Sequence, residues 1–125
     1  MLSIHNRTKR RLSKVDLYNI KGIKNYILKD KYELSLVICG DKLSKRLNQT
    51  YRNKDKPANV LSFPLSKTEG EIFLNSTQAM REAKHFERKP KKHLLALFAH
   101  GCAHLAGYKH SKRMELVESK ALAPT

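Results

Sequence analysis

Hydrophobic residues recur with two different periods along this chain. Four short segments alternate apolar and polar positions, which is typical of half-buried strands: residues 2–6, 32–39, 59–63 and 71–75. In the second of these, Leu34, Leu36 and Ile38 fall on one face. Pro64 is expected to end the third strand, because proline has no N–H for a ladder hydrogen bond.

The other apolar positions follow the helical spacing of three to four residues. They predict three helices by range, over 12–29, 91–106 and 112–121. A fourth helix is expected to begin at Asp41 and to carry Leu43, Leu47 and Tyr51. A fifth is expected to begin at Asn75 or Ser76 and to carry Ala79, Ala83 and Phe86 on one side. Asp41 is expected to cap its helix. The fold class is therefore α+β, with a small mixed sheet of about four strands packed against about five helices, and residues 1–125 are expected to form one domain.

The helix expected over 91–106 is apolar almost all round, which predicts that it is buried. It nevertheless contains His100 and His104, and Gly107 follows as a C-terminal stop. His93 is expected to be the polar start of this helix, with a supporting role beside the other histidines as the alternative. Cys102 falls on another face and is expected to belong to the core.

The charge of the chain adds to this fold prediction the expectation that the domain binds polyanions. There are 26 Lys+Arg and 11 Asp+Glu, a net charge of +15. The electrostatic field of so basic a protein attracts polyanions, so nucleic acid is the first expected partner and an anionic membrane surface the second. The alternative is that the charge serves only to keep the protein in solution. The longest strictly apolar run, 94–99, is too short to span a bilayer, and no signal peptide is apparent, so a cytoplasmic protein is expected.

The stretch HGCAHLAGYKH, residues 100–110, carries the candidate chemistry. His100 and His104 lie one helical turn apart on one face, and Gly107 allows His110 to return toward them. Three imidazoles can bind one zinc ion and leave a coordination position open, as catalytic sites require. The spacing matches the long metalloprotease signature, but Gly101 stands where that motif has its glutamate base. The alternative is that these are core histidines bonded to the backbone.

A second motif, YRNKDKPANVLSFP, covers residues 51–64. Arg52, Lys54 and Lys56 suit contacts with phosphate groups, and an arginine can bind two phosphate oxygens at once. Taken alone, the stretch is better explained as a solvated basic loop before a strand.

Together the two motifs resemble the YbeY family of bacterial zinc-dependent ribonucleases. HGCAHLAGYKH is similar to the family pattern H-G-x-x-H-L-x-G-Y-D-H, and residues 51–64 match Y-R-x-K-D-x-P-T-[DN]-V-L-S-F-P except at Ala58. The stretch GEIFLN, residues 70–75, resembles the family's G-D-I strand, with Glu71 in place of aspartate. The three motifs agree in order and spacing, so the resemblance covers nearly the whole chain.

The resemblance implies a zincin-like metal helix and a zinc-dependent, single-strand-specific endoribonuclease that acts in ribosomal RNA processing and maturation and in ribosome quality control. It implies that His100, His104 and His110 bind one Zn²⁺ per chain and that Arg52 is catalytic, facing the substrate phosphate. The attacking group stays open between a water molecule and the 2′-OH of the RNA. Expected partners are ribosomal RNA and the small ribosomal subunit, and neither a membrane nor DNA is expected.

Lys109 departs from this pattern, because the family has aspartate there. It is expected either to point to solvent, to weaken the metal site, or, like Lys54 and Lys56, to support the site or contact RNA. Two other functions follow from the same residues: a non-catalytic RNA-binding or ribosome-binding assembly factor with a structural zinc, and a zinc hydrolase acting on peptides or small molecules. Gly101 and the charge of +15 argue against the last.

Overall fold

The structure is a computed structural model that describes residues 1–123. In chain order these residues form β1 (Leu2–Asn6), α1 (Lys14–Leu28), β2 (Glu33–Cys39), α2 (Asp41–Arg52), β3 (Val60–Ser66), β4 (Glu69–Asn75), α3 (Ser76–His85), α4 (Pro90–Leu105) and α5 (Lys112–Leu122). The predicted α+β class, with a four-stranded mixed sheet and five helices, is confirmed for this part of the chain.

The four strands lie in the order β1-β2-β4-β3. The first three are parallel, and β3 runs antiparallel to β4 at the edge. Leu36 of β2 is in register with Ile72 of β4, and both side chains are fully buried. Because side chains alternate along a strand, this register puts Leu34, Leu36 and Ile38 of β2 on the same face as Ile72 and Leu74 of β4.

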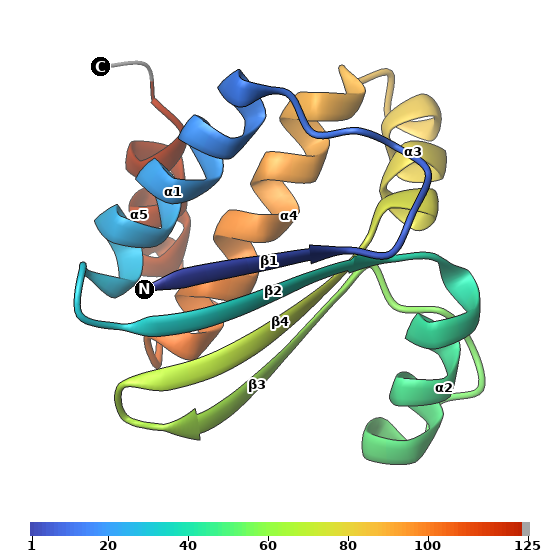
Figure 1. Ribbon diagram of the computed structural model, residues 1–125, viewed down its shortest axis with the longest axis horizontal. Coiled ribbons are helices and arrows are strands. Elements are labelled where there is room, and N and C mark those ends of the chain that lie inside the picture. The colour runs from blue at the N-terminus through green and yellow to red at the C-terminus, as the bar shows by residue number, and fades with distance from the viewer. Residues whose placement is uncertain (124–125) are drawn as a thin grey trace.

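That face is covered by helices, as Figure 1 shows: α1, α4 and α5 lie together on one side, with α3 beyond them and α2 toward the other side. The core between helices and sheet includes Ile20 of α1, Phe98 of α4 and Met114 of α5, each at most 1% exposed. Helix α4 packs against α1, α3, α5 and strands β3 and β4. The prediction that α4 is a buried helix is therefore confirmed for most of its length.

Local side-chain chemistry sets where several helices begin. Ser13 and Asp16 form a reciprocal capping box at the start of α1. Asn75 rather than Ser76 caps α3, because its side chain accepts a hydrogen bond from the amide of Gln78. After α4 the chain turns at Gly107, whose φ of +91° suits glycine.

The expected end of the third strand at Pro64 was wrong. Strand β3 continues to Ser66, Pro64 is in register with Gly70, and the register shifts between Pro64 and Ser66. Proline is tolerated here because β3 has a neighbour on one side only, and an irregular edge strand needs no donor at every position.

Two expectations about helix surfaces were also wrong. Asp41 does not cap α2: the capping position is Gly40, and the Asp41 carboxylate instead accepts hydrogen bonds from Arg81 at 2.7 Å and Asn75 at 2.9 Å. Phe86 does not share the buried side of Ala79 and Ala83, because it follows the end of α3 and is 56% exposed. Within residues 1–123, no helix is both long enough and apolar enough to cross a bilayer.

Candidate metal centre

Close packing of α4 against the sheet explains the glycine after the first histidine. A Cβ atom on Gly101 would lie 3.1 Å from Ser62 Oγ, 3.1 Å from Val60 Cγ2 and 3.2 Å from Ile72 Cδ1. The Ser62 hydroxyl also donates a hydrogen bond to the Gly101 carbonyl at 3.0 Å. A glutamate therefore has no room at this position, and the metal-binding spacing occurs here without the protease base.

The three histidines of the first motif converge in space. Ligand nitrogens of His100, His104 and His110 all lie within 4.8 Å of one another. His100 Nε2 and His104 Nε2 are 3.0 Å apart, and the His110 ring lies 5.3 Å and 5.2 Å from the other two ring centres. His100 is half-buried, while His104 and His110 are exposed. The cluster is thus open to a ligand from outside, in contrast to the alternative of buried core histidines.

A carboxylate from α5 holds the first of these rings. Glu118 Oε1 lies 2.7 Å from His100 Nδ1, and this glutamate side chain is 16% exposed. An ionised carboxylate can only accept, so the proton is on Nδ1, and a neutral His100 directs its Nε2 lone pair toward the other histidines. Sequence reasoning missed Glu118, because it lies on another helix and no spacing rule connects it to His100.

The environment of His104 lowers the pKa of its imidazole. Partial desolvation is the largest cause, followed by the nearby His100, His110 and Arg52 side chains, which all disfavour a positive charge. His104 is therefore neutral at neutral pH, and neutral imidazole is the form that binds a metal ion.

These residues fit a tetrahedral metal ion. Nitrogen ligands lie about 2.0–2.1 Å from zinc, which places two of them about 3.3 Å apart in a tetrahedral site. The 3.0 Å between His100 Nε2 and His104 Nε2 is close to that value. The carboxylate of Glu118 on the remote nitrogen of His100 is also the usual support of a histidine ligand. The group can therefore bind a metal ion, and imidazole donors alone leave its identity open among zinc, copper, iron and nickel.

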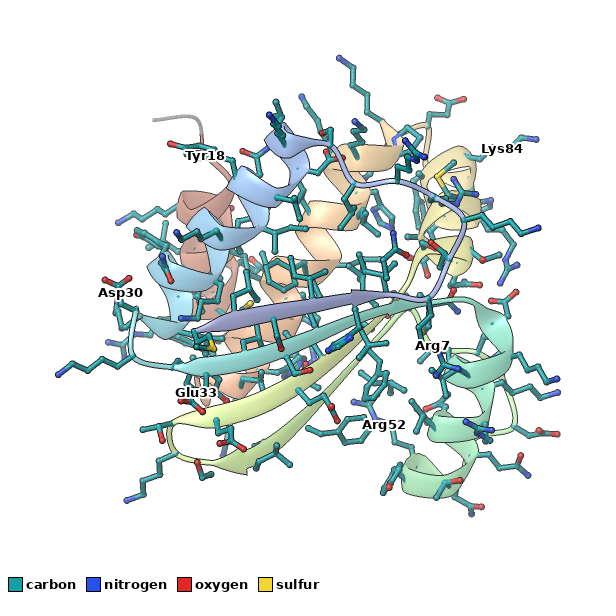
Figure 2. All side chains as sticks on the ribbon, in the orientation of Figure 1. Arg7, Tyr18, Asp30, Glu33, Arg52 and Lys84 are labelled. Carbon is teal, nitrogen blue, oxygen red and sulfur yellow. The ribbon has the colours of Figure 1, made fainter. Side chains whose placement is uncertain are left out.

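The basic residues of the second motif lie outside this cluster, and Arg52 is the one near enough to act on His104. Arg52 ends α2 and is exposed, and Figure 2 shows it on the side of the sheet where α2 lies. Its charge contributes to the lowered pKa of His104. Lys54 and Lys56 follow in the exposed segment before β3, and Lys109 is exposed beside His110. Of the outcomes expected for Lys109, the structure agrees with a side chain in contact with solvent.

Two other residues singled out in the sequence of α4 are not part of the metal cluster. His93 lies near the start of α4, as expected, but it is buried, and its Nε2 lies 2.8 Å from the Glu82 carboxylate of α3. Burial alone would raise the pKa of Glu82, but hydrogen bonds from His93, Gln78 and Asn59 together lower it. Cys102 is fully buried, and burial raises the pKa of its thiol, so its expected place in the core is confirmed.

The fold and the site together define a small basic α+β protein with a surface-exposed cluster of three histidines beside an arginine. A family model described as "Endoribonuclease YbeY" matches residues 4–123. Proteins named Endoribonuclease YbeY include those of Mycoplasma mobile, 35% identical over 97% of this chain and 88% of the relative, and Neorickettsia sennetsu, 34% identical over 87% and 80%. The chain belongs to the endoribonuclease YbeY family.

Other relatives are longer than this chain, and one solved structure is similar over almost all of it. The Endoribonuclease YbeY of Gluconobacter oxydans is 41% identical over 70% of this chain but only 56% of its own length. The solution structure of TM1509 from Thermotoga maritima has a TM-score of 0.71 and 30% sequence identity, and covers 98% of this chain and 87% of that protein.

Proposed function

We propose that this chain, as a single domain, is a metal-dependent endoribonuclease that cuts single-stranded RNA and acts in ribosomal RNA maturation and ribosome quality control in the cytoplasm. The observation that carries the proposal is the open cluster of His100, His104 and His110 beside the charge of Arg52. Its expected partners are ribosomal RNA and the small ribosomal subunit. The family membership and the charge of +15 support RNA as the substrate class.

In this proposal the three imidazoles hold one zinc ion, and each residue around them has a separate task. A bound zinc ion would supply Lewis acidity and lower the pKa of a water molecule. Glu118 keeps the proton of His100 on Nδ1 and so keeps Nε2 free. Arg52 neutralises the charge that develops on the scissile phosphate, a form of transition-state stabilisation. Lys54, Lys56 and Lys109 contact neighbouring phosphates.

The test separates metal binding from catalysis. We expect Arg52→Ala to keep one metal ion per chain but to cleave a single-stranded RNA roughly 10²–10³ times more slowly, the usual cost of losing one charge-stabilising donor. His104→Ala is expected to lose the metal as well. Metal content is measured by elemental mass spectrometry, and cleavage on a denaturing gel. The matched control is Arg46→Ala, because Arg46 is an exposed arginine of the same helix.

Unchanged cleavage in Arg52→Ala would contradict the catalytic role of this arginine.

One observation favours a second function, a non-catalytic RNA-binding factor with a structural metal: Lys109 adds positive charge directly beside His110. That function predicts full metal content and salt-sensitive RNA binding, with no cleavage that depends on the metal.

A further inference from the structure

We infer that the face of the sheet opposite α4 binds unpaired nucleobases through the aromatic side chains of Tyr51, Phe63 and Phe73. The inference rests on the proposed function for RNA as the ligand, and it adds the site that holds the bases. It also separates two tasks in space, since phosphates would be bound by the basic residues at the end of α2.

The three aromatic rings form one continuous cluster although they come from three elements. The Tyr51 ring centre lies 5.1 Å from that of Phe63, which lies 5.8 Å from that of Phe73. Tyr51 is 65% exposed, and the two phenylalanines are half-buried. Exposed rings of this kind are the surfaces on which unpaired bases stack, since every base has an aromatic face.

Strand alternation places the cluster on the face away from the core. In β3, Val60 belongs to the core and the Ser62 hydroxyl reaches Gly101 of α4, so Phe63 projects to the other side. In β4, Ile72 is in the core, and Phe73 projects opposite to it. Edge strand β3 thus has the histidine helix on one face and the aromatic cluster on the other, and a strand of RNA can pass around this edge from one to the other.

The charges around the aromatic cluster determine on which side of it the RNA phosphates would lie. Arg52 follows Tyr51 directly, and Lys54 and Lys56 come next, all exposed. Across the sheet, Glu71 is in register with Phe63 itself, and Glu33 is in register with Glu69, two residues before Glu71 in β4. In Figure 2 Glu33 lies at the opposite end of the sheet from Arg7. Phosphates are therefore attracted to the α2 side and repelled from the other end, which leaves the bases over the aromatic rings.

The experiment compares two oligonucleotides that differ only in their bases. The probes are a fluorescein-labelled 2′-O-methyl RNA strand and an abasic strand of the same length, with binding measured by fluorescence anisotropy and strand integrity checked on a gel. We expect Tyr51→Leu and Phe63→Leu each to weaken binding of the base-bearing strand about fivefold or more, as loss of one stacked base does. Binding of the abasic strand is expected to stay unchanged.

The control is Tyr18→Leu, because Tyr18 is also an exposed tyrosine on a helix, 75% exposed, and lies on α1 away from Arg52 (Figure 2). Tyr51 is largely exposed, so Tyr51→Leu tests the inference even if Phe63→Leu unfolds. Equal loss for both strands, or no loss for either, would overturn the inference, and the second result would favour a protein partner on this face. Cleavage by the wild-type protein is scored separately on an unmodified RNA strand of the same sequence: base-dependent binding without cleavage of that strand would reject the nuclease and keep the binding site.

Discussion

At the scale of single residues, the candidate metal site depends on one hydrogen bond from outside the motif. His100 is half-buried, and its Nδ1 has the Glu118 carboxylate at 2.7 Å. This contact orients the ring and selects the tautomer in which Nε2 is free for a metal. Loss of a hydrogen-bond partner that supports a metal-binding histidine usually lowers the metal affinity by a factor of about 10–100.

Glu118→Ala is therefore expected to weaken zinc binding by roughly 10–100-fold, measured by competition with a coloured chelator. Glu118→Gln keeps an oxygen that can accept the Nδ1 proton, so it should retain most of the affinity. Glu115→Ala is the matched control, since Glu115 is an exposed glutamate of the same helix. Equal affinity of Glu118→Ala and wild type would show that the contact does not tune the site.

At the scale of elements, the closeness of α4 to β3 and β4 determines where the histidines lie. Gly101 contacts the strands through its backbone, and Val60 and Ile72 beneath it are 8% and 0% exposed. These buried side chains have no space into which to retreat. The other glycine within a helix, Gly22 of α1, is exposed and has no neighbour within 4 Å of the position of its Cβ.

The two glycines are expected to respond oppositely to alanine. Gly22→Ala should raise the free energy of unfolding by up to about 1 kcal/mol, because alanine is the better helix former. Gly101→Ala has the same propensity gain but adds a methyl group to a filled space, which costs about 1–3 kcal/mol, so it should destabilise the protein. Urea unfolding of both variants measures this. A Gly101→Ala protein as stable as Gly22→Ala would mean that the helix can move away from the sheet.

At the scale of the whole molecule, the net charge of +15 has two parts: a general electrostatic field around the protein and a local track of basic residues. The field attracts any polyanion and speeds its association. The local track consists of Arg52, Lys54 and Lys56, which are exposed and follow Tyr51 of the aromatic cluster in the chain. Only residues that contact phosphates, those of the track and Lys109, are expected to release counterions from a bound strand.

The salt dependence of RNA binding tests this division. For single strands, log K falls with log salt concentration by about 0.7 per phosphate contact. Replacing Lys54 and Lys56 together by glutamine should therefore reduce the slope by roughly 1.4. Lys21→Gln, on exposed α1, should leave the slope unchanged. An unchanged slope in the double variant would mean that these lysines act only through the general field.

The sequence by itself determined the local elements and the candidate ligands. Alternation and helical spacing predicted every strand and helix between residues 2 and 122, because each pattern reflects which face of one element is buried. The histidine motif predicted three imidazoles that can converge, because His100 and His104 share a helix face and Gly107 permits the turn that follows. The resemblance carried by the two motifs predicted the family that the comparisons confirm.

Only the tertiary structure decided what those elements meet. Glu118 on His100, Glu82 on His93 and Arg81 on Asp41 are contacts between residues of different elements, and their partners depend on packing rather than on spacing. The same reason explains why Pro64 continues a strand, since only the strand order shows that β3 is at the edge. The aromatic cluster likewise exists only because the register of β3 on β4 brings Phe63 and Phe73 together under Tyr51. The spacing of apolar residues indicates which face of an element is buried, whereas contacts between residues distant in sequence depend on how those buried faces pack together.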